Sequence, residues 1–573
     1  MRTFSELKKN LKKDFSLLEH KKVAILGDTS TQLLYQAIRA TGYDKGYNLE
    51  VFEADFNQID RQIFDPSSEL YEFNPEFVII FQSSHKLLYS YNKMNLNQSY
   101  SLADERIEKI KEFIHVLQVN LKAKIIYYNY PEIDDAIFGN YANNTTLSFL
   151  YQIRKLNFEL MNLTTSQRNF YICDLSTIQN QLGKSVMFDT SVYINTEMVL
   201  SLDALPVIAS RTIDLVAALS GKFKKCLILD LDNTTWGGII GDDGIENIQI
   251  GSLGIGKAFS EFQYWAKKLK QRGVILAVCS KNTESIAKEP FEKHPDMVLR
   301  LDDIAVFVAN WENKADNIRH IQQVLNIGFD SMVFLDDNPF ERNLVREQIK
   351  DITVPELPED PADYLEYLYT LNLFETISFS ELDAERTKQY QVEAQRVDLQ
   401  KKITNEDDFL KTLSMTSLVE SFNKFNIPRV AQLSQRSNQF NLRTIRYTEA
   451  DIELLAQSGK YYTFTFTLDD KFGENGLVCV IILEKLDEMN LFIDTWFMSC
   501  RVLKRGMEGF VLNTIVEFAQ LNGFKNIIGE YIPTPKNEMV KDHFKHLGFQ
   551  EIGGKWQLEL SEYQYKNVYI TKK

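Results

Sequence analysis

The stretch of sequence that most restricts the fold is a short apolar run followed at once by two carboxylates. Residues 226–229 read Cys-Leu-Ile-Leu and lead directly into Asp230 and Asp232, with Thr234 just beyond. Such a run is typical of a strand buried on both faces of a parallel sheet. The two carboxylates then lie at its carboxyl end, where open α/β sheets bind their ligands. Because carboxylates this close repel one another, they favour a hard cation such as Mg²⁺.

Two further apolar runs end in polar residues in the same way. Residues 274–280 form a second expected strand ending in Ser280, followed by Lys281. Residues 332–335 form a third, ending in Asp336 and Asp337. Between them, Lys314 opens an amphipathic segment. A capped turn after a core strand would explain one of these acids but not the whole ordered series.

The series resembles the haloacid dehalogenase (HAD) superfamily of phosphotransferases. The resemblance implies that Asp230 is the nucleophile, Asp232 the general acid and base, and Thr234 a residue that holds the first loop. It also implies that Ser280, Lys281 and Lys314 contact the phosphoryl group, and that Glu341 is an outer acid. The implied Mg²⁺ ligands are Asp230, the backbone carbonyl of Asp232, and Asp337, with Asp336 as a further candidate.

Composition and charge argue against several kinds of partner, site and location for this protein. The chain of 573 residues carries a net charge of −15, which argues against nucleic acid as a partner. It has five cysteines without a close pair, so neither a zinc site nor a disulfide framework is indicated. Its basic first residues lack the apolar core of a signal peptide, and no apolar run approaches a membrane span. We therefore expect a cytoplasmic protein that does not bind a membrane.

The first 220 residues predict a separate parallel sheet. Strand-like runs at residues 23–26, 77–81, 124–128 and 170–173 alternate with helical segments. Gly27-Asp28-Thr29-Ser30 resembles the opening block of SGNH hydrolases, but Thr29 replaces the serine nucleophile, and the family's Asp-x-x-His is absent. We therefore expect an SGNH-like or flavodoxin-like scaffold without esterase activity, in which Asp28 and Thr29 cap a helix.

The last third of the chain resembles GNAT-type acyltransferases. Strand-like residues 462–468, 477–483 and 491–498 precede a basic, glycine-containing loop and an amphipathic helix. In that fold such a loop holds the phosphates of coenzyme A or phosphopantetheine. The resemblance assigns this role to Arg501, Lys504, Arg505 and Gly506. Leu503, Glu508 and Phe544 depart from the family pattern, so pantetheine binding is favoured over acetyl transfer. A GNAT-shaped interaction domain remains the alternative.

The order of these parts, with strings such as Asn438-Gln439-Phe440-Asn441, resembles FkbH-like proteins of HAD subfamily IIIC. The expected fold class is α/β multidomain, with an SGNH/flavodoxin-like parallel sheet, a Rossmann-like HAD parallel sheet and a GNAT-like α+β domain. The expected divisions are an SGNH-like domain at residues 1–220, a HAD domain at 221–375, a helical connector at 376–415 and a GNAT-like domain at 416–573.

The family resemblance implies a reaction in which a glyceryl-type group leaves an acyl phosphate, such as 1,3-bisphosphoglycerate, and reaches an acyl carrier protein through an enzyme thioester. The candidate thiols are Cys279, beside Ser280, and Cys500, beside the basic loop. Each could instead be a small buried core residue. Two alternatives remain: a phosphatase acting on a sugar phosphate or polysaccharide precursor, and an assembly scaffold whose HAD site is regulatory.

Overall fold

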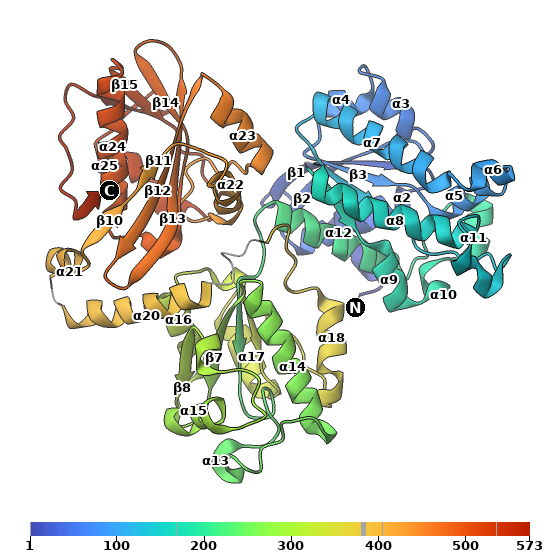
Figure 1. Ribbon diagram of the computed structural model, residues 1–573, viewed down its shortest axis with the longest axis horizontal. Coiled ribbons are helices and arrows are strands. Elements are labelled where there is room, and N and C mark those ends of the chain that lie inside the picture. The colour runs from blue at the N-terminus through green and yellow to red at the C-terminus, as the bar shows by residue number, and fades with distance from the viewer. Residues whose placement is uncertain (1, 168, 380–385, 404, 535) are drawn as a thin grey trace. The chain divides into compact units, whose positions relative to one another are not determined.

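The computed structural model describes residues 2–167, 169–379, 386–403, 405–534 and 536–573, and Figure 1 labels its helices and strands. The chain forms two compact units, Met1–Ala217 and Ala218–Lys573. Both contain parallel β-sheet, so the α/β multidomain prediction is confirmed. In the part of the chain that is described, no helix has the length and apolar character needed to cross a membrane.

The first unit contains a five-stranded parallel sheet in the order β2-β1-β3-β4-β5. This is the flavodoxin-like strand order, in which the connections diverge between β1 and β3. Its strands are β1 (Glu19–Gly27), β2 (Tyr47–Glu53), β3 (Phe77–Phe81), β4 (Lys124–Tyr128) and β5 (Phe170–Cys173). The sequence predicted every strand of this sheet except β2, which lies at its edge.

Helices cover this sheet. Alternate strand residues such as Ala24, Val78 and Ile125 pack with α3, α5, α7 and α8, and α7 and α8 lie side by side in Figure 1. From the opposite face, Tyr128 hydrogen-bonds to Thr212 on α12 at 2.6 Å. The helices are α1 (Phe4–Lys8), α2 (Gln32–Asp44), α3 (Ile59–Phe64), α4 (Glu69–Phe73), α5 (Ser84–Tyr91), α6 (Leu96–Ser99), α7 (Leu102–Asn120), α8 (Phe149–Ser166), α9 (Leu175–Leu182), α10 (Lys184–Met187), α11 (Thr190–Thr196) and α12 (Leu205–Leu219).

The second unit begins with a four-stranded parallel sheet in the order β8-β7-β6-β9. Its strands are β6 (Cys226–Leu229), β7 (Ile275–Ser280), β8 (Val306–Ala309) and β9 (Met332–Leu335). Leu227 and Leu229 face one cluster of buried apolar residues, whereas Cys226 and Ile228 face another. Both faces are therefore buried, as the continuous apolar runs predicted.

Helices on the two faces of this sheet build those clusters. Residues of α14 and α18 pack into one, and residues of α16 and α17 pack into the other. The helices are α13 (Ile240–Asp243), α14 (Gly254–Gln271), α15 (Glu284–Lys293), α16 (Lys314–Leu325), α17 (Pro339–Gln348) and α18 (Tyr364–Leu371). Within the predicted connector, α20 (Arg386–Lys402) and α21 (Glu406–Thr412) are helical, while residues 380–385 and 404 lie outside the described residues.

The rest of the second unit is a mixed sheet in the order β16-β17-β15-β14-β13-β12-β10-β18, with β11 beside β12. Its strands are β10 (Met415–Ser417), β11 (Val419–Glu420), β12 (Tyr461–Asp470), β13 (Gly473–Lys485), β14 (Asn490–Met498), β15 (Asn526–Gly529), β16 (Gln550–Ile552), β17 (Lys555–Glu559) and β18 (Ile570–Lys572). An antiparallel meander of β12, β13 and β14 leads through a helix into β15, which runs parallel to β14. This is the α+β arrangement that the sequence predicted.

The helices of this part lie on both faces of the mixed sheet. They are α22 (Ile427–Arg436), α23 (Glu449–Gln457), α24 (Met507–Leu521) and α25 (His543–Leu547). Residues of α24 and α25 belong to the large cluster around Trp496, and residues of α22 and α23 pack with Val480 and Phe497 in another. The mixed sheet therefore has an apolar core on each face.

Candidate functional site

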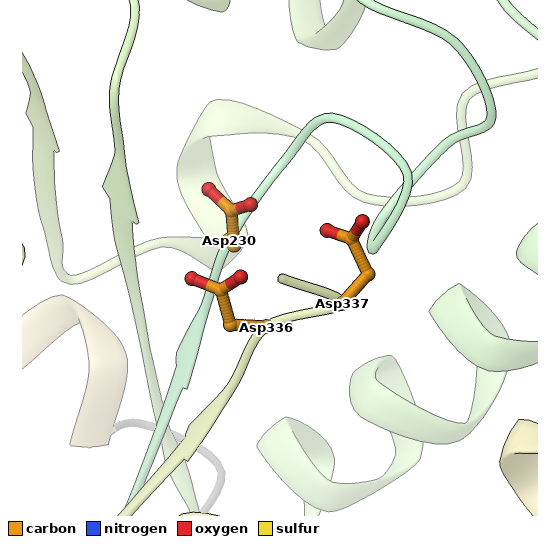
Figure 2. Close-up of side chains that lie close together, drawn as sticks. All are labelled: Asp230, Asp336 and Asp337. Atoms are coloured by element: carbon orange, nitrogen blue, oxygen red, sulfur yellow. The ribbon is translucent and has the colours of Figure 1, made fainter. Parts of the chain in front are cut away.

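The polar residues predicted to act together meet at the carboxyl ends of β6 and β9, which are neighbours in the sheet. Asp230 directly follows β6, and Asp336 and Asp337 directly follow β9. Figure 2 shows their three carboxyl groups gathered at these strand ends. Asp230 and Asp336 are buried, and Asp337 is partly buried. Strands β6 and β9 therefore hold the three carboxylates in one acidic centre.

Lys314 supplies the positive charge of this centre. Its Nζ lies 3.0 Å from Asp230 Oδ1 and 2.6 Å from Asp336 Oδ2, and the residue is only 3% exposed. Burial alone would lower the pKa of Lys314, but the charges of Asp230 and Asp336 raise it above the usual lysine value. Lys314 therefore remains an ammonium group beside the carboxylate expected to act as nucleophile.

The acidic centre fits a divalent cation. Asp230, Asp336 and Asp337 each offer an oxygen, and these oxygens all lie within 4.8 Å of one another. Asp230 Oδ1 is buried, and apart from the Lys314 ammonium no described residue donates to it. Three carboxylates against one ammonium leave excess negative charge. Carboxylate oxygens suit Mg²⁺ as ligands.

The pKa values of two of these acids reflect the same excess of negative charge. Burial, and after it the charge of Asp230, raises the pKa of Asp336 to about 7. The same two causes raise the pKa of Asp337. Asp336 was only a further candidate ligand in the sequence, whereas the structure groups its carboxylate with those of Asp230 and Asp337.

The carboxylate of Asp232 points away from the acidic cluster and is held by three donors. Its Oδ1 accepts from Trp236 Nε1 at 3.0 Å and from the Ile240 amide at 3.1 Å. Its Oδ2 accepts from Asn282 Nδ2 at 3.1 Å. Burial raises the pKa of Asp232. The Asp232 carboxylate is therefore not part of the group of three acids, and its backbone carbonyl as a metal ligand stays a prediction.

Short contacts hold the loops that follow β6 and β9. Thr234 Oγ1 donates to Asp337 Oδ1 at 3.1 Å and accepts from the Asp337 amide at 2.9 Å. The Thr235 hydroxyl donates to the Asp230 carbonyl at 2.6 Å. Arg342 Nη1 donates to the carbonyls of Asp336 and Asp337 at 2.8 and 2.6 Å. Asn282, Thr235 and Arg342 were not assigned from the sequence, although each lies within six residues of a motif that was.

The polar residues after β7 divide into two groups. Ser280 ends β7, is 1% exposed, and lies at the same edge of the sheet as Asp230. Lys281, which was expected to contact phosphate, instead forms an ion pair with Glu341 at 2.6 Å. Cys279 is fully buried, and burial raises its pKa well above the usual thiol value. Its environment therefore does not favour the thiolate that an acyl carrier needs.

The basic loop before α24 is largely committed to internal contacts. Arg505 pairs with Asp470, at 3.3 Å, and with Glu393. Arg501 is 8% exposed and donates to Ser499 Oγ and to Gln389. The structure thus does not favour these two arginines as free phosphate ligands. Lys504 is exposed and Gly506 precedes the helix. The side chain of Cys500 lies outside the part of the chain that the structure describes.

In the first unit, Asp28 and Thr29 follow β1 but do not cap α2 by side-chain hydrogen bonds. Both oxygens of Asp28 accept from the Ser83 amide, at 2.9 and 3.0 Å, and the N-cap of α2 is Thr31, without a side-chain capping bond. The expectation that they cap the helix is therefore wrong. Burial raises the pKa of Asp28 to about 7. Thr29 is fully buried and its hydroxyl has no partner among the described residues.

Comparisons with known proteins bear on both units. The buried aspartate, lysine and acidic pair at parallel strand ends define a phosphatase-type domain of the HAD class. The model of the FkbH N-terminal domain matches residues 22–217. A crystal structure of the N-terminal part of the protein BF1531 from Bacteroides fragilis, containing a phosphatase domain complexed with Mg, is 62% identical. It covers 66% of this chain and 100% of its own, with a TM-score of 0.64. The chain therefore belongs to the FkbH-like family of HAD-superfamily proteins.

More distant likenesses involve about a quarter of the chain. The ribosomal-protein-S18-alanine N-acetyltransferase from Escherichia coli is 13% identical over 27% of this chain and 99% of its own, with a TM-score of 0.21. The spermidine N-acetyltransferase from Vibrio cholerae in complex with CoA and spermine is 11% identical over 26% of this chain and 97% of its own, with a TM-score of 0.21. No match was found among curated proteins.

The contacts of Arg505 predict that Asp470→Asn destabilises the second unit. The Asp470 side chain is fully buried and accepts from Arg396 at 2.7 and 2.9 Å as well as from Arg505. Removing its charge leaves two buried guanidinium groups to share the single carboxylate of Glu393, which costs about 3–5 kcal/mol. Urea unfolding followed by tryptophan fluorescence measures this unit, because all five tryptophans lie beyond residue 218.

The neighbouring Asp469→Asn is the matched control. Asp469 is partly exposed and pairs with Lys573, so its substitution should cost less than about 1 kcal/mol. Equal, small effects of the two substitutions would contradict the structural role of this network and leave Arg505 available for a ligand.

The raised pKa of Asp28 predicts a pH-dependent stability of the first unit. Between the unfolded value of 3.8 and the folded value of about 7, the folded chain keeps a proton that the unfolded chain releases. The unit should therefore lose stability as the pH rises through this range, by about 4 kcal/mol in order of magnitude. Asp28→Asn should remove this loss and be more stable than the wild type at pH 8 but not at pH 4.

Pulse proteolysis in urea, read from protected fragments of residues 2–217, measures this stability. Asp60→Asn, at an exposed acid of the same unit, is the control and should leave the pH dependence unchanged. A difference between Asp28→Asn and the wild type that is the same at pH 4 and pH 8 would show that Asp28 does not titrate in this range.

Proposed function

We propose that the second unit removes the phosphoryl group of a small phosphorylated substrate, with Mg²⁺ bound among Asp230, Asp336 and Asp337. The observation that carries the proposal is the buried Asp230 carboxylate, 3.0 Å from the Lys314 ammonium and within a cluster of three acids. The Bacteroides fragilis relative, whose phosphatase domain was crystallised with Mg, supports both the reaction class and the metal.

The residues suit a two-step transfer through Asp230. An oxygen of Asp230 attacks phosphorus, the bond to the leaving oxygen breaks, and an aspartyl-phosphate forms. Lys314 offsets the negative charge of the phosphoryl oxygens and of Asp230 during this approach. Ser280 ends the neighbouring strand β7, and its hydroxyl is the group that we propose donates to a phosphoryl oxygen. Water then hydrolyses the aspartyl-phosphate and frees Asp230.

Asp232 is the group that exchanges the proton. Its carboxyl is fixed by Trp236, Ile240 and Asn282, two residues beyond the nucleophile. In the first step it gives a proton to the leaving oxygen, and in the second it takes one from the attacking water. Bound Mg²⁺ would supply Lewis-acid charge that lowers the repulsion between Asp230 and the phosphoryl group.

We further propose that an acyl transfer is coupled to this phosphatase reaction. A thiolate attacks the carbonyl carbon of a glyceryl-type acyl phosphate, the C–S bond forms, and inorganic phosphate leaves. The phosphatase site removes the remaining phosphoryl group, and the acyl group passes to the pantetheine thiol of an acyl carrier protein. Membership of the FkbH-like family supports this sequence of steps.

Burial of the other four cysteines bears on which thiol we propose as the acyl carrier. Cys173, Cys226, Cys279 and Cys479 are all buried. Cys500, beside the exposed Lys504 in the loop before α24, is therefore the thiol that we propose for the acyl group. For phosphopantetheine or coenzyme A in the same region, Lys504 and the backbone of Gly506 are the groups that internal ion pairs leave available.

The phosphatase proposal predicts that Asp230→Asn lowers phosphate release from a phosphomonoester by at least about a thousandfold, because the nucleophile is removed. Asp337→Asn should instead raise the Mg²⁺ concentration needed for half-maximal activity. The measurement is phosphate release from p-nitrophenyl phosphate and from 3-phosphoglycerate over a Mg²⁺ titration. Removing divalent ions with EDTA should abolish activity, and added Mg²⁺ should restore it.

Asp302→Asn is a matched control, because this acid belongs to the same unit but not to the acidic cluster. It should leave both kcat and the Mg²⁺ requirement unchanged. Phosphate release that persists in Asp230→Asn, or that is indifferent to EDTA, would rule out this site as the catalytic centre.

The acyl-transfer proposal predicts a covalent glyceryl or phosphoglyceryl adduct on the intact protein. The protein is incubated with Mg²⁺ and 1,3-bisphosphoglycerate generated in situ, and its mass is measured. The adduct should persist in Cys279→Ala, whose thiol is buried, and be lost in Cys500→Ala. If wild type acquires no adduct while Asp230-dependent phosphate release continues, the protein is a phosphatase without acyl transfer from this donor.

A further inference from the structure

The first unit contains a polar cavity at the position where parallel sheets bind ligands. The cavity has a volume of about 440 Å³, within the usual range for small-molecule sites. Asp28 follows β1, and Gln82 and Ser83 follow β3, so the cavity opens at the carboxyl ends of these two neighbouring strands. In the order β2-β1-β3-β4-β5, the connections diverge between these strands, which is the expected ligand position.

The cavity holds a cation that has no carboxylate within ion-pair distance among the described residues. Arg106, on α7, lines it and makes no ion pair within the described residues. The other charged groups of the lining are engaged: Lys86 pairs with Glu197 at 2.5 Å, and Asp60 pairs with Lys109 at 3.3 Å. Arg106 therefore offers its guanidinium to an anionic group.

Asp28 faces the same cavity without forming an ion pair with Arg106. It is held by the Ser83 amide, and burial raises its pKa to about 7, so the carboxyl keeps a substantial protonated fraction near neutral pH. A protonated carboxyl both donates and accepts hydrogen bonds, as a hydroxyl partner requires. An ammonium group would need Asp28 ionised and would be repelled by Arg106 and Lys86.

Gln82 offers the cavity hydrogen-bond donors in a fixed orientation. Its Oε1 accepts from the hydroxyls of Tyr127 at 2.7 Å and Tyr130 at 3.3 Å, so the side chain is fixed with its NH₂ group opposite. No described residue accepts from that NH₂ group. Because both tyrosines are fully buried, this arrangement is rigid and leaves two N–H donors for a ligand.

Among the described residues, this cavity has no nucleophile paired with a general base, which hydrolysis requires. Thr29, at the expected nucleophile position, is fully buried. In the described part of the unit, no histidine hydrogen-bonds to Thr29 or Ser83. His85 packs against Phe188 and Tyr193, and burial lowers its pKa to about 4. A hydroxyl without a base is a poor nucleophile, so the cavity can hold a ligand but has no group to cleave it.

We propose that this cavity is a non-catalytic binding site for a small hydroxylated carboxylate, with the carboxylate on Arg106 and a hydroxyl on Asp28 and the Gln82 amide. The site is separate from the phosphatase centre and goes beyond the reaction proposed for it. Its ligand can bridge Arg106 and Asp28 because both line one cavity and neither forms an ion pair with another described residue.

Isothermal titration of the full chain with D-glycerate, in the absence of Mg²⁺, tests this site. An unphosphorylated probe limits binding at the phosphatase centre. D-Glycerate should bind at least about tenfold more tightly than propionate, which lacks hydroxyls, glycerol, which lacks the charge, and serine, which adds an ammonium group. Hydrogen exchange should show protection at residues 82–90 and not at residues 230–240.

Variants separate the site from adventitious binding. Arg106→Gln should weaken D-glycerate binding at least about tenfold, and Ser90→Phe, at a lining position on α5, should block it by bulk. Arg154→Gln, at an exposed arginine of the same unit paired with Glu132, is the matched control and should bind as the wild type does. Pulse proteolysis confirms that each variant folds.

Several results would overturn the proposal. They are no measurable binding of D-glycerate, binding that Arg106→Gln and Ser90→Phe leave intact, tighter binding of serine than of glycerate, and protection at residues 230–240 instead of 82–90. Loss of phosphatase activity in Asp230→Asn bears only on the second unit, so the two proposals can fail independently.

Discussion

The ion pairs of Lys314 with Asp230 and Asp336 are the contacts on which the chemistry of the second unit depends. A lysine at the first position of α16 is opposed by the helix dipole, so its place there needs the two carboxylates 3.0 and 2.6 Å away. One ammonium reduces the repulsion among three acids but does not cancel it, and the remainder favours a divalent cation. The apolar face of α16 fixes this balance, because Ala315, Ile318 and Ile321 anchor the helix in the core beneath the site.

In both parallel sheets an aspartate follows the first strand, but the charges around the two aspartates differ. Asp28 follows β1 and Asp230 follows β6, which is the first strand of each sheet along the chain. In each sheet, the connections to the neighbouring strands run in opposite directions from this point. Asp230 has a lysine within ion-pair distance and stands among other acids, so it suits charge-driven phosphoryl chemistry. Asp28 accepts only a backbone amide and is pushed toward its neutral form by burial. The same position in the fold therefore carries the nucleophile that we propose in one unit and the ligand-binding carboxyl that we propose in the other.

What could be predicted from the sequence depended on how completely each element is buried. Central strands such as β4 and β6 are continuous apolar runs and were located from the sequence. The edge strand β2 is only partly buried, and polar residues interrupt its sequence, so no continuous apolar run marks it. The edge strand β8 is also only partly buried and was not assigned, although its four residues are all apolar. The acids at the ends of β6 and β9 were predicted because they directly follow fully buried apolar strands. The groups that orient Asp232 were not, because Asn282 and the Ile240 amide reach it from other loops and a single sequence carries no record of that contact.

Basic residues near a glycine or a strand end are the least informative of the sequence signals, since their role depends on carboxylates far away in the chain. Arg505 lies in a loop that resembles a phosphate-binding loop, yet Asp470 and Glu393 neutralise it. Lys281 follows a catalytic-type strand, yet Glu341 neutralises it. Arg106 belongs to no motif and lies within a long amphipathic helix, but it reaches a cavity without an acidic partner. The presence or absence of an internal counter-ion, rather than the motif, therefore decides which of these cations can bind an anionic ligand.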